Sequence, residues 1–292
     1  MADRPLAAPL AGIKVLEFSH TVMGPTAGLI FAELDADVVK IEPAPNGDHT
    51  RGLGGFGAGF FAAFNRNKRS LAVDLKRKEG QAVIHRLAVG ADVVLENYGP
   101  GTMERLGCGY EMLARLNPRL VYLALKGYLD EVVQFQTGLA FMTGPIGQPL
   151  RAGASVIDIM GAMFGVIAAQ AALRERDATG KGQRVSSALF ENAAFLMSTH
   201  MAGMIATGLG ARPMPARRGA WAIYEVFNTA GGGQLFIGVT SDQQWTRFVE
   251  EFGLQELAAD PRLATNVMRL AERSWLIPAL QEVLAAIPQD PL

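Results

Sequence analysis

Cysteine is almost absent from this chain, which has one, Cys108, among 292 residues. An internal disulfide is therefore impossible, and this composition favours a reducing, cytoplasmic compartment. The four histidines, His20, His49, His85 and His200, show no metal-ligand spacing, and a single cysteine does not complete a metal site. The sequence therefore predicts no metal centre.

An excess of charge of one sign and long apolar runs are also missing. The formal net charge is −1, with 27 basic and 28 acidic side chains. Such a balance argues against a nucleic-acid partner or a charged membrane surface. The longest apolar run, residues 159–169, is shorter than the roughly 20 residues that span a bilayer. Residues 1–10 lack a basic segment followed by an apolar core, so no secretory leader is expected.

Short apolar runs alternate with helical segments, and hydrophobic residues make up 49% of the chain. Residues 12–18 and 36–42 predict strands, and Gly24-Pro25 opens a helix between them. A strand, a helix and a second strand within about 30 residues form a βαβ unit, which requires a parallel sheet. We therefore expect an α/β fold.

The same alternation continues along the chain and predicts a Rossmann-like, doubly wound large domain. Its further strands are expected at residues 70–74, 91–96, 120–125 and 184–189. Residues 208–218 are rich in glycine, proline and arginine and predict a linker. The linker would separate the large domain, residues 1–207, from a smaller α/β domain, residues 219–292. In the smaller domain, apolar runs flank Gly231-Gly232-Gly233 and predict a hairpin.

Two aspartates, Asp130 and Asp158, stand beside apolar segments near expected strand ends. Each precedes a helical segment, so each is suited to cap a helix, where a carboxylate accepts backbone N–H bonds. A carboxylate in such surroundings is equally suited to act as a nucleophile or a proton acceptor. The sequence pattern leaves both roles open for both residues.

The segment Asn97-Tyr98-Gly99-Pro100-Gly101 follows an expected strand, and Arg105 lies four residues beyond it. Ligands of open α/β sheets bind at the carboxyl ends of the strands. This loop offers an amide, an aromatic face and a cation, which suit an adenine and a phosphate. It therefore predicts a nucleotide-like ligand.

Six motifs in the chain resemble, in the same order, those of the family III CoA-transferases, or CaiB/BaiF family. They are residues 12–18, 24–25, 37–42, 65–70, 94–101 and 179–183. That family includes formyl-CoA, carnitine and dicarboxylate CoA-transferases and also α-methylacyl-CoA racemases. The resemblance covers about residues 10–250 and implies a large and a small domain in a homodimer whose two subunits interlock like links of a chain.

The resemblance also implies acyl-CoA and a carboxylic acid as substrates, with no tightly bound cofactor. The implied CoA positions are Val22, Met23, Val73, Asp74, Leu75, Lys76, Asn97, Tyr98, Gly99, Arg105, Lys126, Gly127 and Tyr128. Pro43 stands where some relatives carry an arginine. Similarity to the relatives further implies a longer loop between Tyr128 and Asp130 and more residues beyond Leu292.

Transferases of the family resemble one another in using an aspartate nucleophile. Many carry it in a loop after Thr-Gly, but here residues 143–149 contain no acid. A subset of the family is similar to this chain in an aspartate at the position of Asp158. The resemblance therefore implies Asp158 as the nucleophile, with Asp130 as second candidate. Transfer would run through an aspartyl anhydride and an aspartyl-CoA thioester.

Two other functions stay open. Racemases of the family carry a histidine at the position of Leu129, which has no group to move a proton. The missing loop acid leaves a CoA-binding protein without transferase activity as the second alternative. For a transferase, Arg151 and the cluster Arg212, Arg217 and Arg218 would suit a dicarboxylic acceptor, although the cluster also fits a basic surface linker.

Overall fold

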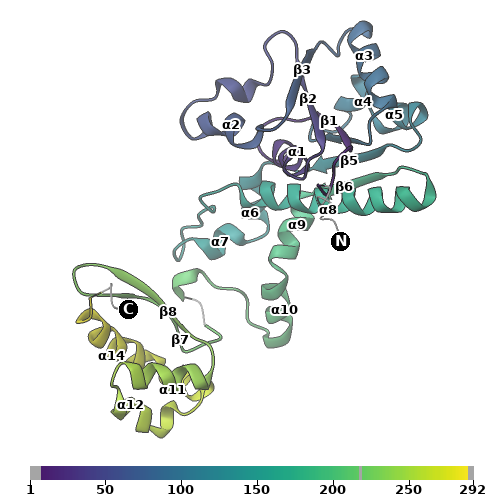
Figure 1. Ribbon diagram of the computed structural model, residues 1–292. Helices are drawn as coiled ribbons and strands as arrows, with labels where there is room; N and C mark the ends of the chain where they lie inside the picture. The colour runs from purple at the N-terminus through teal and green to yellow at the C-terminus, as the bar shows by residue number, and fades with distance from the viewer. Residues whose placement is uncertain (1–7, 217–218, 289–292) are drawn as a thin grey trace, which may run out of the picture. The chain divides into compact units, whose positions relative to one another are not determined.

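The computed structural model describes residues 8–216 and 219–288. Contacts between residues divide the chain into two units, residues 1–216 and 217–292, and Figure 1 shows the elements of both. The division falls inside the segment 208–218 that the composition predicts as a linker, of which residues 217 and 218 lie outside the described residues. Each unit is therefore considered by itself.

A sheet of six parallel strands forms the centre of the first unit, as the apolar runs predict. The strands are β1 (Lys14–Phe18), β2 (Asp37–Pro43), β3 (Arg69–Val73), β4 (Val93–Glu96), β5 (Val121–Lys126) and β6 (Arg184–Ala188). Their order is β3-β2-β1-β4-β5-β6, and all neighbours are parallel. The order reverses between β1 and β4, so their following loops diverge and leave a crevice for a ligand. The expected α/β, Rossmann-like architecture is confirmed.

Helices cover both faces of this sheet (Figure 1). One face packs against α1 (Met23–Glu33) and α8 (Val156–Thr179). The other packs against α3 (Lys78–Val89), α4 (Thr102–Arg105) and α5 (Tyr110–Leu116). Because both faces are covered, the central strands are apolar without interruption, and residues 121–125 of β5 are all buried.

Helix α8 lies unusually close to its neighbours because it carries glycine at the contacts. A Cβ atom at Gly165 would lie 2.5 Å from Leu125 Cδ2, and one at Gly161 would lie 2.6 Å from Met23 Cε. The helix has 24 residues, more than the apolar run of residues 159–169. By length and composition it is the single helix among the described residues that would pass for a membrane span. That is weak evidence, because a packed core helix meets the same criterion.

Five shorter helices also belong to the first unit. They are α2 (Phe60–Phe64), α6 (Asp130–Gln136), α7 (Leu139–Thr143), α9 (Leu189–Leu196) and α10 (Ser198–Thr207). Helix α6 directly follows the end of β5, because Gly127 turns the chain there with a φ of 152°. A Cβ at this position would also meet Leu189 Cγ at 2.6 Å, so only glycine fits.

The second unit contains the hairpin that the glycine run predicts. Strands β7 (Ile223–Asn228) and β8 (Gln234–Val239) are antiparallel. The helices are α11 (Asp242–Glu251), α12 (Gln255–Ala259), α13 (Asn266–Ala271) and α14 (Arg273–Ala285). Trp245, Leu276 and Leu280 are buried between the hairpin and these helices. Their burial gives the unit a hydrophobic core of its own.

Candidate active site

Two cavities adjoin at the carboxyl ends of the strands, where the reversal of strand order leaves the crevice. The larger cavity has a volume of about 840 Å³ and is lined mainly by the loops after β2, β3 and β4. The smaller cavity measures about 500 Å³ and is lined by the loops after β1 and β5 and by the start of α8. Both linings include His20 and Gly99, so the two cavities meet at these residues.

Twelve of the thirteen positions expected to bind CoA line these cavities. The larger cavity has Val73, Asp74, Leu75, Lys76, Tyr98 and Gly99. The smaller has Val22, Met23, Asn97, Gly99, Lys126, Gly127 and Tyr128. Arg105 lines neither, and its guanidinium is exposed and donates a hydrogen bond to Thr102 Oγ1 at 2.8 Å. The structure therefore brings the expected residues together, with the exception of Arg105.

Among the residues of the larger cavity that sequence reasoning missed are Ser19, His20, Asp48 and His49. The signal for them was their place in the loops that follow β1 and β2. The His20 ring stacks on Tyr98 with ring centroids 5.6 Å apart, and the His49 ring lies 5.5 Å from it. Burial, and secondarily the His49 ring, lowers the pKa of His20. We therefore expect a neutral His20 at pH 7.

Asn97 joins the loops that follow β1 and β4. Its Oδ1 accepts a hydrogen bond from the His20 backbone N–H at 3.1 Å, and its Nδ2 donates to the His20 carbonyl at 3.0 Å. A Cβ atom at Gly24 would lie 2.4 Å from Ser19 Cβ and 2.9 Å from Asn97 Cγ. The glycine of the Gly24-Pro25 motif therefore leaves room for this junction.

The ammonium group of Lys126 is held at the edge of the smaller cavity. It forms an ion pair with Glu96 and donates to the Tyr98 carbonyl at 3.3 Å. The Tyr98 backbone N–H donates to the other oxygen of Glu96 at 2.9 Å. Burial raises the pKa of Glu96. The pair therefore fixes the loop after β4 as well as Lys126.

Asp130 caps α8, although it belongs to α6. Its Oδ2 accepts hydrogen bonds from the backbone N–H groups of Ile157 at 2.7 Å and Asp158 at 2.9 Å. Its Oδ1 accepts a hydrogen bond from Gln134. The expectation that Asp130 caps the helix that follows it is wrong, because α6 begins at Asp130 itself and its carboxylate turns towards α8.

The Asp158 carboxylate therefore does not cap α8. The N-cap of α8 is Ser155, whose side chain makes no capping bond, and Asp130 serves the N–H groups of the first turn. The Asp158 side chain lines the smaller cavity. Among the described residues, its carboxylate has no hydrogen-bond or ion-pair partner. Burial, and then the charges of Asp130 and Glu131, raise the pKa of Asp158 to about 7.

This combination of fold and site defines a class of protein. The parallel sheet with reversed strand order binds nucleotide-like ligands at the crevice, and here the crevice leads to an unpaired carboxylate of raised pKa. Perturbed carboxylates of this kind mark catalytic sites. In the part of the chain that the structure describes, no three His, Cys, Asp or Glu side chains form a group able to hold a metal ion. The class is therefore that of α/β proteins with a ligand crevice at the carboxyl ends of parallel strands, here with an unpaired carboxylate beside it.

Comparison with known proteins assigns the family. Residues 10–291 match the model of CoA-transferase family III, and the chain belongs to that family, as its motifs predict. It is 35% identical to an acyl-CoA transferase of Fusarium pseudograminearum, over 95% of this chain and 66% of that protein. It is 36% identical to the succinate–glutarate CoA-transferase of Agrobacterium fabrum, over 94% of this chain and 74% of that protein.

A solved structure shows the same fold. The crystal structure of a CaiB/BaiF family protein from Brucella suis superimposes with a TM-score of 0.83 at 33% sequence identity. The superposition covers 97% of this chain and 80% of that protein. This chain therefore spans 66% to 80% of the length of these relatives.

Proposed function

We propose that the protein transfers CoA from an acyl-CoA thioester to a carboxylic acid, with Asp158 as the nucleophile. The observation that carries the proposal is that Asp130 and Asp158 have different roles in the structure. Asp130 supplies the cap of α8, so the Asp158 carboxylate stays unpaired in the smaller cavity. A carboxylate that is removed from water and has a raised pKa is a stronger nucleophile than an ordinary one.

The two cavities suit the two ends of CoA. The larger one has the volume for the nucleotide end and offers the cation of Lys76 and the ring of Tyr98. The smaller one holds Asp158 and suits the thioester. The arm between them would pass His20 and Gly99, where the cavities meet. This order places the thioester carbon beside the nucleophile.

The reaction consists of four acyl transfers without a net change of protons or electrons. An Asp158 oxygen attacks the thioester carbon, the C–S bond breaks, and an acyl-aspartyl anhydride and the CoA thiolate form. The thiolate attacks the aspartyl carbon of the anhydride, which releases the first acid and leaves an aspartyl-CoA thioester. The acceptor carboxylate displaces the thiolate from it, forming a second anhydride. The thiolate then attacks the acceptor's acyl carbon and frees Asp158.

Water has to be kept from the anhydrides, because they hydrolyse. Apolar side chains of Val22, Met23, Leu125 and Leu189 line the smaller cavity around Asp158. Leu125 and Leu189 are buried, and Gly127 and Gly161 allow Leu189 to approach closely. This lining favours acyl transfer over hydrolysis.

Neither alternative function accounts for the site as well. Racemisation needs a second proton carrier, and at the position before Asp130 the side chain is Leu129, which is 71% exposed. A protein that only binds CoA has no use for an unpaired, half-buried carboxylate, because withdrawing one from water without a partner is costly. Transfer is therefore the function that the geometry supports best.

A dicarboxylic acceptor is supported by the relative named for succinate and glutarate. Arg151 does not supply a free cation for it, because its guanidinium pairs with Glu131 and donates to the Ala152 carbonyl at 2.8 Å. Arg212 is exposed, while Arg217 and Arg218 lie outside the described residues.

A homodimer is part of the proposal. Large apolar side chains are exposed on α9 and α10, among them Phe195 at 64% and Ile205 at 86%. Exposed apolar surface of this kind is common at protein interfaces. A second copy covering these helices would remove it from water.

Transfer is tested with a panel of acyl-CoA donors, each offered with and without carboxylic acids. We expect a new CoA thioester only when both substrates are present, detected by mass spectrometry. Hydroxylamine added during turnover should convert the aspartyl thioester into a hydroxamate that maps to Asp158. CoA binding without either product would favour the binding protein, and epimerisation of a 2-methylacyl-CoA without transfer would favour the racemase.

The rate should depend on pH through Asp158. Only the ionised carboxylate is a nucleophile, so kcat/KM should rise as pH increases through about 7 and level off above it. Because the charge of Glu131 contributes to the raised pKa, Glu131→Gln should move this rise to lower pH. Rates measured from about pH 5 to pH 9 test both statements, and a flat profile would contradict them.

A further inference from the structure

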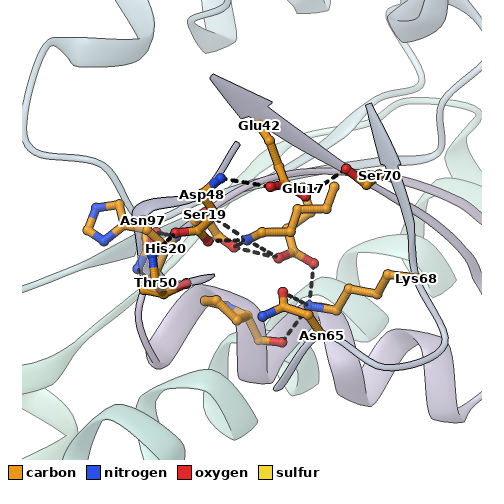
Figure 2. Close-up of polar contacts among 12 residues, drawn as sticks. Glu17, Ser19, His20, Glu42, Asp48, Thr50, Asn65, Lys68, Ser70 and Asn97 are labelled. Carbon is orange, nitrogen blue, oxygen red and sulfur yellow. Dashed lines mark hydrogen bonds and ion pairs between the residues drawn. The ribbon is translucent and has the colours of Figure 1, made fainter. Parts of the chain in front are cut away.

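Three charged side chains are buried beneath the loop that follows β1. Glu17, Lys40 and Lys68, here called the buried triad, have side chains that are 0%, 1% and 2% exposed. Lys40 Nζ lies 3.3 Å from Glu17 Oε1. Lys68 Nζ lies 2.7 Å from Glu17 Oε2, and Figure 2 draws the ion pair between Lys68 and Glu17. None of the three lines either cavity, so the proposed reaction gives them no direct role.

Stability alone does not account for the buried triad. Removing charges from water costs free energy that their mutual attraction often fails to return, so a buried ion pair is weak evidence for stabilisation. Burial lowers the pKa of Lys68 to about 8 although Glu17 is beside it. Helix α1 even carries glycine to make room, because a Cβ atom at Gly28 would lie 1.8 Å from Glu17 Oε2.

The two lysines hold both ends of the segment of residues 19–25, which consists of the loop after β1 and the first turn of α1. Lys40 Nζ donates to the Ser19 carbonyl at 2.8 Å and to Ser19 Oγ at 3.1 Å. Lys68 Nζ donates to the Pro25 carbonyl at 2.8 Å. Between these anchors the loop contributes His20 to both cavities and Val22 to the smaller one. Both anchors share one counter-charge, Glu17.

Lys40 also reaches the loop that follows β2. Its Nζ lies 3.0 Å from Asp48 Oδ2, and Asp48 lines the larger cavity. The Asp48 backbone N–H donates to Glu42 at 2.7 Å, which fixes the other side of this loop. One buried ammonium group therefore sets the positions of two cavity-lining loops relative to each other.

We propose that Glu17, Lys40 and Lys68 are positioning residues for CoA: they hold the segment of residues 19–25 and Asp48 in the conformation that binds the thioester. This inference rests on the proposed function for the identity of the ligand. The buried charges give directed contacts to backbone carbonyls that apolar side chains of the same size do not make.

The test replaces one complete ion pair. The variant Glu17→Met with Lys68→Met removes both partners together and leaves Lys40 paired with Asp48. We expect it to unfold at or above the wild-type temperature, because no buried charge is left unpaired. Its dissociation constant for CoA, measured by calorimetry, should rise about 10-fold or more, because the anchor of Lys68 on the Pro25 carbonyl is lost. Wild-type affinity for CoA in this folded variant would overturn the proposal.

A control removes a partly buried pair near the amino end of β4. Arg176 Nη1 lies 2.8 Å from Asp92 Oδ1, and neither residue lines either of the two cavities. Arg176→Met with Asp92→Asn should leave the affinity for CoA unchanged, and an equal loss there would overturn a specific role of the buried triad. If the double variant fails to fold, Lys68→Met alone releases the Pro25 carbonyl, and unchanged CoA affinity would then be the contrary result.

CoA affinity tests the positioning role, whereas CoA transfer tests the proposed function, so the two can fail separately. A wild-type protein that binds CoA but transfers none would contradict the proposed function and leave the positioning role supported by the affinities. A wild-type protein that does not bind CoA would overturn both.

Discussion

Asp158→Asn is expected to abolish CoA transfer while the protein stays folded and binds CoA. An amide does not form the acyl anhydride, so the rate should fall by about 10³-fold or more. The folded state holds the Asp158 proton up to about pH 7, whereas the usual value is 3.8. The stability that this proton contributes is present at low pH and is lost as pH rises through 7. At pH 8 the variant should therefore melt at or above the wild-type temperature.

Asp130→Asn is the matched control, because it makes the same chemical change in the neighbouring acid. Asparagine caps helices about as well as aspartate, so this variant should keep the start of α8 and retain transfer at a reduced rate. Transfer is followed by chromatography of the CoA thioesters, and melting by circular dichroism at two pH values. Normal transfer by Asp158→Asn together with none by Asp130→Asn would reverse the two roles.

Glu17→Gln should destabilise the fold by about 3 kcal/mol, because it removes one partner from a buried ion pair. Lys40 keeps Asp48 as a counter-charge, but Lys68 keeps only neutral partners, the Pro25 carbonyl and Asn65 Oδ1. The pKa of Lys68 is already lowered to about 8, so the residue can release its proton in the variant. That release holds the cost near the lower end of the roughly 3–5 kcal/mol seen for broken buried pairs. Urea denaturation at pH 7 measures the difference.

The control for Glu17→Gln is Glu33→Gln, which removes an exposed pair in the same unit. Glu33 and Arg66 lie 3.0 Å apart, with side chains 45% and 57% exposed. Water screens this pair, so its loss should cost less than about 1 kcal/mol. Equal losses of stability in the two variants would show that burial of the Glu17 carboxylate is not the cause.

Much of the fold and of the site was predictable from local patterns. Strands such as β5, buried on both faces, are continuous apolar runs, and their spacing around helices dictates a parallel sheet. Parallel strands bring their carboxyl ends to one edge, so the loops after β1, β3, β4 and β5 had to meet there. That is why twelve of the thirteen expected CoA positions line two adjoining cavities.

The separation of the two aspartates was not predictable, because both precede helices and both fit the pattern of a cap. The deciding hydrogen bonds join Asp130 to backbone groups 27 and 28 residues further along the chain. A contact over this distance depends on how α6 and α8 pack, which no local pattern records. Arg105 is the one expected position that lines neither cavity, because its guanidinium donates a hydrogen bond to Thr102 Oγ1. Its contact with CoA stays a prediction.

By itself, the sequence determined the family, the parallel α/β sheet and the edge of the sheet at which the expected site lies, because motifs, hydrophobic periodicity and the alternation of strands with helices are local properties of the chain. Only the tertiary structure decided which acid is free to react and which is a cap. It alone placed Lys40 and Lys68 around Glu17, because their elements meet only when β1, β2 and the start of β3 lie side by side. Burial and neighbouring groups set the pKa and the role of a charged side chain, and both arise from packing between distant segments.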